Sequence, residues 1–194
     1  MLKELSHFDN LGTPSYFYEL LLTLKENQEA GWKIDDVNRI FYNRIIDNRR
    51  LFDGCIQLAI KIGILLSADG YIFIDKKLLM SLNSIAQMKD RIVEYLLKAV
   101  ANDDDFYQIF NSQYLSYDVI YKSPQISINA FGFKYSNFKQ LLIDFNVITP
   151  HPIPEIKNLM INPRYKKIFD KEVLSLSFVQ SKGKSFKRRK NHKI

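Results

Sequence analysis

The stretch from Leu58 to Ile74 reads LAIKIGILLSADGYIFI, and its pattern decides the fold of the N-terminal part of the chain. Apolar residues at helical spacing continue to Ile62, and Gly63 stands where a helix end is expected. The following residues are apolar and extended, and Ala68-Asp69-Gly70 is the turn pattern of a tight β-hairpin. The stretch therefore predicts a helix that leads directly into a two-stranded hairpin.

An apolar stripe defines the helix nearest to this hairpin, with Asn48 as its N-cap. The stripe repeats at steps of four, three and four residues, which predicts a buried helix face, and it consists of Leu51, Cys55, Leu58 and Ile62. Cys55 is thus expected to be a packed core residue.

Two further helices are expected upstream. A first helix runs from Ser15 to about Asn27, because Thr13-Pro14 supplies a cap and a first-turn proline. A second helix starts at Asp35, where an acid favours the helix dipole, and continues through Arg44. The segment Gly31–Ile34 between them is short and extended, and its Trp32 is expected to be a core or staple residue.

Three modest helices followed by a hairpin resemble the winged-helix arrangement over about residues 13–78. The resemblance rests on Leu58–Leu65 and on Gly70–Ile74, which are similar to the corresponding step in many bacterial winged helix-turn-helix modules.

A long helix is expected after this unit, from about Ser84 to Phe110, with one apolar face. The acidic run Asp103–Asp105 is expected to interrupt or expose part of it. Its length favours a connector between two lobes.

A second lobe is expected to repeat the order of the first. Tyr117–Tyr121 suits a short helix or a strand, ended by Pro124, and Ile126–Phe131 suits either a second helix or a strand. An amphipathic helix is predicted over Ser136–Asn146. Two strands, Val147–Thr149 and Asn158–Ile161, then flank a proline-rich tip, and a final helix is expected over Arg164–Leu174.

These elements predict a mainly α fold with small β-hairpins, of the α+β class, with two winged-helix-like units joined by a long helix. The expected division is an N-terminal winged-helix-like domain at 1–80, a connecting helix at 81–112, a C-terminal winged-helix-like domain at 113–176 and a basic tail at 177–194.

The net charge of +7 comes entirely from the C-terminus. Residues 1–181 contain 21 Lys or Arg and 21 Asp or Glu, and seven cations follow without an acid: Lys182, Lys184, Lys187, Arg188, Arg189, Lys190 and Lys193. Such a tail is expected to bind nucleic acid in a salt-dependent way. A solubilising terminus, a ribosomal or membrane-surface contact and ordering by a partner protein are the alternatives.

Composition favours a cytoplasmic protein. The single cysteine cannot form an internal disulfide, which suits a reducing compartment. The first residues lack the apolar stretch of a signal peptide, and no apolar run approaches the ~18 residues of a membrane span. We therefore expect no membrane partner.

The exposed face of the third helix is a second candidate nucleic-acid site. Arg49, Arg50, Gln57 and Lys61 fall on this face, and Arg and Gln can hydrogen-bond base edges in the major groove. Asp53 lies among them and would repel phosphates, so an ordinary solvated face is the alternative. The matching second-lobe face (Asn137, Lys139, Gln140 and Asp144) is the weaker candidate.

Catalytic motifs are missing from the sequence, and we expect no enzyme, cofactor or metal. There is no P-loop, no dinucleotide-binding glycine pattern, no G-x-S-x-G elbow and no zinc-ligand spacing among His7, His151 and His192. Asp144 with Glu155-Ile156-Lys157 mimics a nuclease metal site. However, Asp144 falls on a predicted helix and Glu155 follows a proline-rich tip, so the carboxylates would not share adjacent strands.

The whole chain resembles tandem winged-helix proteins, and Ile161–Phe169 is similar to the end of such modules in bacterial restriction and antiviral-defence proteins. The chain also resembles the kleisin-interacting winged-helix subunits of SMC-type complexes, although its basic tail departs from their often acidic character. Both resemblances imply a non-catalytic accessory subunit that binds a larger ATPase or nuclease partner. The alternative is a stand-alone winged-helix transcriptional regulator that binds DNA.

Overall fold

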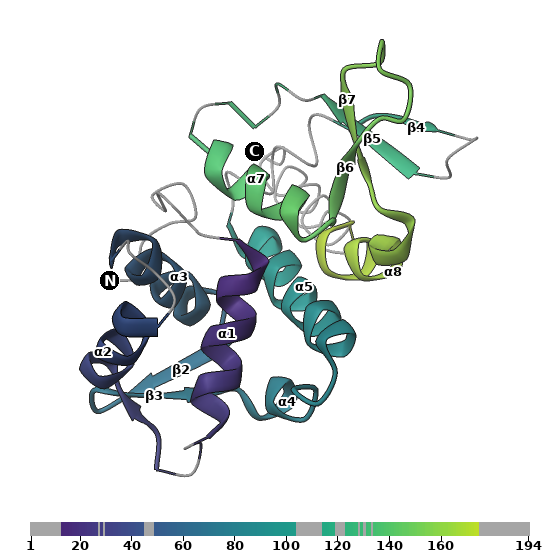
Figure 1. Cartoon of the computed structure of the whole chain (residues 1–194). Coiled ribbons are helices and arrows are strands. Elements are labelled where there is room, and N and C mark those ends of the chain that lie inside the picture. The colour runs from purple at the N-terminus through teal and green to yellow at the C-terminus, as the bar shows by residue number, and fades with distance from the viewer. Residues whose placement is uncertain are drawn as a thin grey trace, which may run out of the picture.

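The protein is an α+β structure in which helices pack between two small antiparallel sheets (Figure 1). The computed structural model describes residues 13–26, 28, 30–44, 49–103, 114–118, 123–127, 129, 131–132 and 134–174. The elements of the N-terminal part are α1 (Pro14–Lys25), β1 (Trp32–Lys33), α2 (Ile34–Arg44), α3 (Arg49–Lys61), β2 (Leu65–Ala68), β3 (Tyr71–Ile74), α4 (Lys76–Leu79) and α5 (Ile85–Asn102).

The predicted hairpin is confirmed in position and in turn chemistry. Strand β2 pairs with β3 in an antiparallel register that joins Leu65 to Ile74 and Ala68 to Tyr71. Asp69 and Gly70 both have positive φ, of 52° and 80°, as a type I′ turn requires. Strand β1 adds to the other side of β3, so the sheet order is β1-β3-β2.

Helix α5 is shorter than the helix expected from the sequence. It begins at the N-cap Ser84, whose hydroxyl accepts a hydrogen bond from the Gln87 N–H, and it ends at Asn102 because Asp103 is extended. The expected interruption at the acidic run is confirmed at Asp103, and residues 104–110 lie outside the described part. An acidic side chain at the C-terminal end of a helix is repelled by the negative end of the helix dipole, which disfavours continuation of α5 through the acidic run. The Asp103 carboxylate accepts a hydrogen bond from the Tyr135 hydroxyl.

The C-terminal part contains a four-stranded sheet of order β4-β5-β7-β6. Its elements are β4 (Tyr114–Asp118), β5 (Ser123–Ser127), α7 (Ser136–Asp144), β6 (Ile148–Pro150), β7 (Asn158–Ile161), the 3-10 turn η2 (Pro163–Tyr165), α8 (Lys166–Phe169) and the π-helical turn η3 (Asp170–Leu174). Helix α7, strands β6 and β7 and the final helical segment match the sequence-based expectation.

Ile126 lies in a strand, so its assignment to a second-helix position is wrong and the strand alternative holds. Its backbone pairs with Leu159 of β7, and its side chain is buried. Tyr117 likewise lies in strand β4, opposite Pro124 of β5. Within the described residues, the C-terminal part therefore has two strands where the N-terminal part has helices.

One hydrophobic cluster runs through both parts of the molecule. Helix α5 supplies seven buried residues to it: Met88, Ile92, Val93, Leu96, Leu97, Val100 and Ala101. Phe17 of α1 meets Phe145, just after α7, with ring centroids 5.7 Å apart in an edge-to-face arrangement. The segment expected to connect two lobes is thus part of their shared core, and α1 and α5 lie between the two sheets in Figure 1.

Candidate functional site

The α3 face presents two of the expected nucleic-acid contacts. Gln57 is exposed and Lys61 is half-buried, and they lie about one turn apart on the helix. Arg49 and Arg50 lie in the first turn of α3, but their side chains lie outside the described residues. Asp53 is exposed at the helical position between these pairs. The predicted face therefore contains a carboxylate as well as polar and basic groups.

The hairpin next to α3 adds no positive charge. Its exposed tip contains Asp69, and residues 65–74 include no Lys or Arg. Across residues 13–80, nine Lys or Arg are balanced by nine Asp or Glu. Duplex binding depends largely on phosphate neutralisation, so this balance gives the N-terminal part little general attraction for DNA.

The second-lobe face is similarly balanced. Asn137, Gln140 and Asp144 are exposed on α7, Lys139 is half-buried, and the Gln140 amide donates to the Asp144 carboxylate at 2.8 Å. The Asp144 carboxylate therefore already has a hydrogen-bond donor on its own helix.

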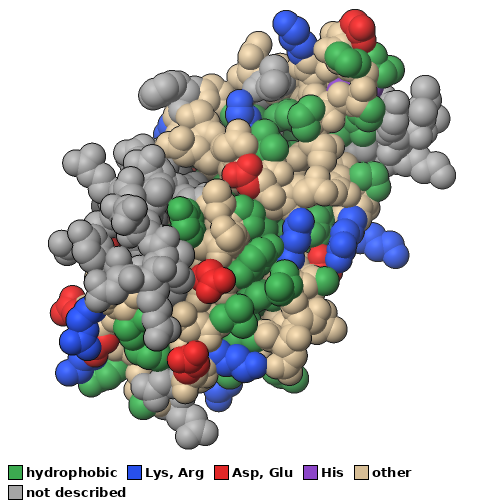
Figure 2. Space-filling view, viewed as in Figure 1, with side chains coloured by type: hydrophobic (Ala, Val, Ile, Leu, Met, Phe, Trp, Pro, Cys, Tyr) green, Lys and Arg blue, Asp and Glu red, His purple; other side chains and the backbone are tan. Residues whose placement is uncertain are grey.

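A basic surface over α8 was missed by the sequence analysis. Arg164, Lys167 and Lys171 are exposed there, and Figure 2 shows Lys and Arg side chains gathered over this part of the molecule. Arg164 pairs with Asp90 at 2.8 Å, and Lys171 pairs with Glu172 at 3.1 Å. The Lys166-Lys167 pair after Pro163 indicates this surface in the sequence, although the net charge of residues 1–181 as a whole is zero.

The basic tail follows this surface in the chain. Its predicted contacts all lie outside the described residues: Lys182, Lys184, Lys187, Arg188, Arg189, Lys190 and Lys193. Their contribution therefore rests on sequence and charge.

The residues of the nuclease-like pattern are not arranged on adjacent strands. Asp144 ends helix α7, whereas Glu155 and Lys157 are exposed in the loop between β6 and β7. Across the parts of the chain that the structure describes, no three His, Cys, Asp or Glu side chains form a group able to hold a metal ion.

His151 and Cys55 are both buried. His151 has a local structural role, because its Nδ1 accepts a hydrogen bond from the Ile153 N–H at 3.0 Å. His7 and His192 lie outside the described residues.

Burial raises the pKa of the Cys55 thiol, which keeps it protonated and unreactive. Trp32 is half-buried, and its indole N–H donates to the Leu24 carbonyl at 2.9 Å, in agreement with the predicted staple role.

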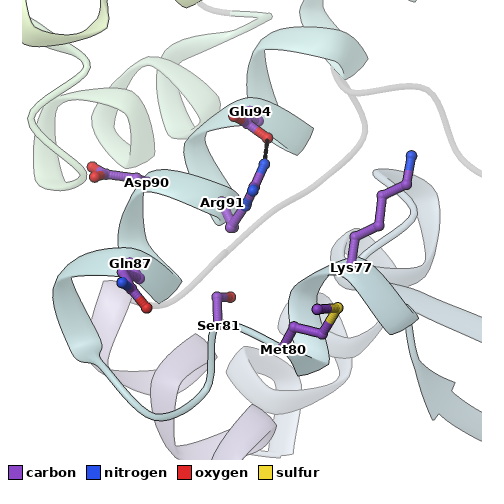
Figure 3. Close-up of a pocket in the computed structure, with 7 residues that line it drawn as sticks. All are labelled: Lys77, Met80, Ser81, Gln87, Asp90, Arg91 and Glu94. Carbon is purple, nitrogen blue, oxygen red and sulfur yellow. Dashed lines mark hydrogen bonds and ion pairs between the residues drawn. The ribbon is translucent and has the colours of Figure 1, made fainter.

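A cleft of about 480 Å³ lies between α4 and the first turns of α5 (Figure 3). Lys77 and Met80 line one wall, and Gln87, Arg91 and Glu94 line the other. Met80 is 83% exposed, the largest exposed fraction among the large apolar side chains that the structure describes as exposed. Sequence periodicity could not identify this cleft, because it forms where the chain reverses between two helices.

Comparison of the chain with protein-family models, with curated proteins and with solved structures finds no match in any of the three. Among the helices described, none has the length and apolar character needed to cross a membrane.

Proposed function

We propose that the chain is a non-catalytic accessory subunit of a bacterial defence or DNA-maintenance complex. In this role it binds nucleic acid through its C-terminal basic segment, defined as residues 164–194, and docks on a larger ATPase or nuclease partner through its folded helices. The unequal distribution of charge is the observation that supports this proposal best.

The C-terminal basic segment contains eleven Lys or Arg and two acidic residues, whereas residues 1–163 contain 17 Lys or Arg and 19 Asp or Glu. The segment starts on the folded surface, where Lys167 is exposed on α8, and continues through the seven tail cations. A strongly basic segment attached to a slightly acidic body favours sequence-independent contact with phosphates.

A winged-helix assignment of the N-terminal part is the structural side of the proposal. It is supported by the order α1, β1, α2, α3, β2, β3 and by the antiparallel addition of β1 to the hairpin. For a second unit, the support is narrower: helix α7 followed by the pair β6 and β7 repeats the helix-then-hairpin half of that order.

Protein contact is the role that the charge balance favours for the N-terminal unit. A winged helix that binds DNA places its third helix in the major groove beside phosphates. Here Asp53 and Asp69 would face those phosphates, and the unit has no excess of cations. This balance does not favour the stand-alone regulator.

The nucleic-acid part is tested by measuring affinity for a fluorescein-labelled duplex by anisotropy between 50 and 200 mM salt. One variant replaces the seven tail cations, Lys182 to Lys193, with Gln. The logarithm of the association constant falls with the logarithm of salt concentration by roughly 0.9 for each phosphate neutralised on B-DNA. We expect the variant to bind weakly and to show a much flatter salt dependence, with the slope reduced by up to roughly six.

The matched control replaces Lys33, Arg39 and Lys61 of the N-terminal unit with Gln, and it should retain most of the affinity and slope. Two unrelated duplex sequences should bind equally. Tight preference for one duplex that survives loss of the tail cations would instead establish the regulator. Unchanged binding after loss of the tail cations would overturn the nucleic-acid part.

The partner is tested separately by purification from the native host with and without nuclease treatment, followed by mass spectrometry. A stoichiometric ATPase or nuclease that remains after treatment supports the accessory role. Recovery of nucleic acid alone contradicts it.

A further inference from the structure

The cleft between α4 and α5 combines one exposed apolar side chain, that of Met80, with a preformed shape. Met80 stands at its edge beside Lys77 (Figure 3) and is 83% exposed. A large apolar side chain exposed at the edge of a cleft is the kind of anchor that a partner side chain covers.

Hydrogen bonds hold the walls of the cleft in place. The Tyr95 hydroxyl donates to the carboxylate of Asp75, the N-cap of α4, and so ties α4 to α5. The Ser81 hydroxyl donates to the Leu78 carbonyl at 2.6 Å, and Lys25 of α1 donates to Asn83 at 2.8 Å. A site that is already ordered loses little conformational entropy when a partner binds.

The charges around the cleft are not balanced once their ion pairs are taken into account. Asp90 pairs with Arg164 at 2.8 Å, and Glu94 pairs with Arg91 at 2.8 Å. Lys77 is exposed and forms no ion pair with any residue that the structure describes. The rim therefore offers a positive charge next to the apolar Met80.

We propose that this cleft docks an acidic amphipathic helix of the partner protein. The apolar face of that helix covers Met80, and its carboxylates lie against Lys77. Helix-in-groove binding uses such apolar anchors at helical spacing, and the flexible thioether of Met adapts to them. A nucleic-acid strand fits less well, because it would cover the apolar Met80 with phosphate. This inference rests on the proposed accessory role and names the surface and chemistry of its partner.

The test uses the full chain and three labelled helical peptides of about four turns. The first peptide has a Leu face flanked by Glu, the second replaces Glu with Lys, and the third replaces Leu with Ser. A labelled single-stranded oligonucleotide is the fourth probe. We expect only the Leu and Glu peptide to bind well.

Met80→Glu should weaken binding of this peptide at least tenfold, because it places a charge at the apolar anchor. Lys77→Gln should weaken it by roughly two- to fivefold, the size of one exposed ion pair. The matched control is Ile153→Glu, which changes a 40% exposed apolar residue in the loop between β6 and β7 and should leave binding unchanged. Unchanged thermal unfolding of all three variants excludes a folding defect.

The inference is overturned if the Lys peptide binds as tightly as the Glu peptide or more tightly, or if Ile153→Glu weakens peptide binding as much as Met80→Glu does. It is also overturned if no peptide binds and Met80→Glu instead loses affinity for the oligonucleotide. The two proposals separate cleanly. The tail variant should keep peptide affinity while it loses duplex affinity, and Met80→Glu should do the reverse.

Discussion

Replacement of Gly31 by Ala tests how β1 is joined to the N-terminal sheet. Gly31 precedes β1 with φ of +71°, a left-handed conformation that costs an L-residue about 1–2 kcal/mol. A Cβ at this position would lie 2.5 Å from Cε1 and 2.6 Å from Cζ of Phe73 on β3. Because real Cβ contacts are longer, the Phe73 ring must shift, and overpacking of this kind costs about 1–3 kcal/mol more.

The expected total loss of unfolding free energy is about 2–5 kcal/mol, measured by urea denaturation followed by circular dichroism. Gly70→Ala is the matched control, since Gly70 has φ of +80° but no atom within 4 Å of the added Cβ. It should lose only the conformational part, about 1–2 kcal/mol. The difference between the two variants measures the clash with Phe73.

A Phe73→Leu background removes the two ring atoms nearest to the new Cβ. In that background, Gly31→Ala should cost about as much as Gly70→Ala. If Gly31→Ala costs no more than Gly70→Ala in the natural background, or if Phe73→Leu does not reduce its cost, the close approach of β1 and Phe73 is refuted.

Three further predictions concern the body of the fold. Burial, the negative charge of Asp90 and a 3.2 Å hydrogen bond to it raise the pKa of Tyr165 to about 12, against 10 for an ordinary tyrosine. The unfolded chain therefore loses this proton first, so stability should fall as pH rises from 10 to 12, and Tyr165→Phe should reduce that fall in pH-dependent urea titrations. Asn162→Ala should cost about 1–2 kcal/mol in the same assay, because Asn162 accepts from the Arg164 N–H at 3.0 Å and donates to the Asn146 carbonyl at 2.8 Å; a loss near zero would show that these bonds do not stabilise the C-terminal helix. Cys55, only 1% exposed, should react with a thiol reagent at a rate that rises with urea as the fold opens, and fast labelling in water would contradict its burial.

The candidate surfaces differ in how far the sequence could reveal them. Exposure of Gln57 follows from the helical period of the apolar stripe on α3, so it was predictable. The cleft beside Met80 was not, because its walls come from two helices and its charge depends on which acids are already paired. Asp90 and Arg164 are 74 residues apart in the chain, and only the packed structure shows that they neutralise each other.

The sequence by itself determined the elements that depend on near neighbours. The stripe from Leu51 to Ile62 predicted α3, and Asp69-Gly70 predicted the hairpin, because helix periodicity and turn chemistry act over a few residues. The tertiary structure decided the elements with two locally acceptable conformations. Ile126 suited a helix or a strand, and it became a strand because the backbone of β7, some thirty residues further on, supplied its hydrogen bonds.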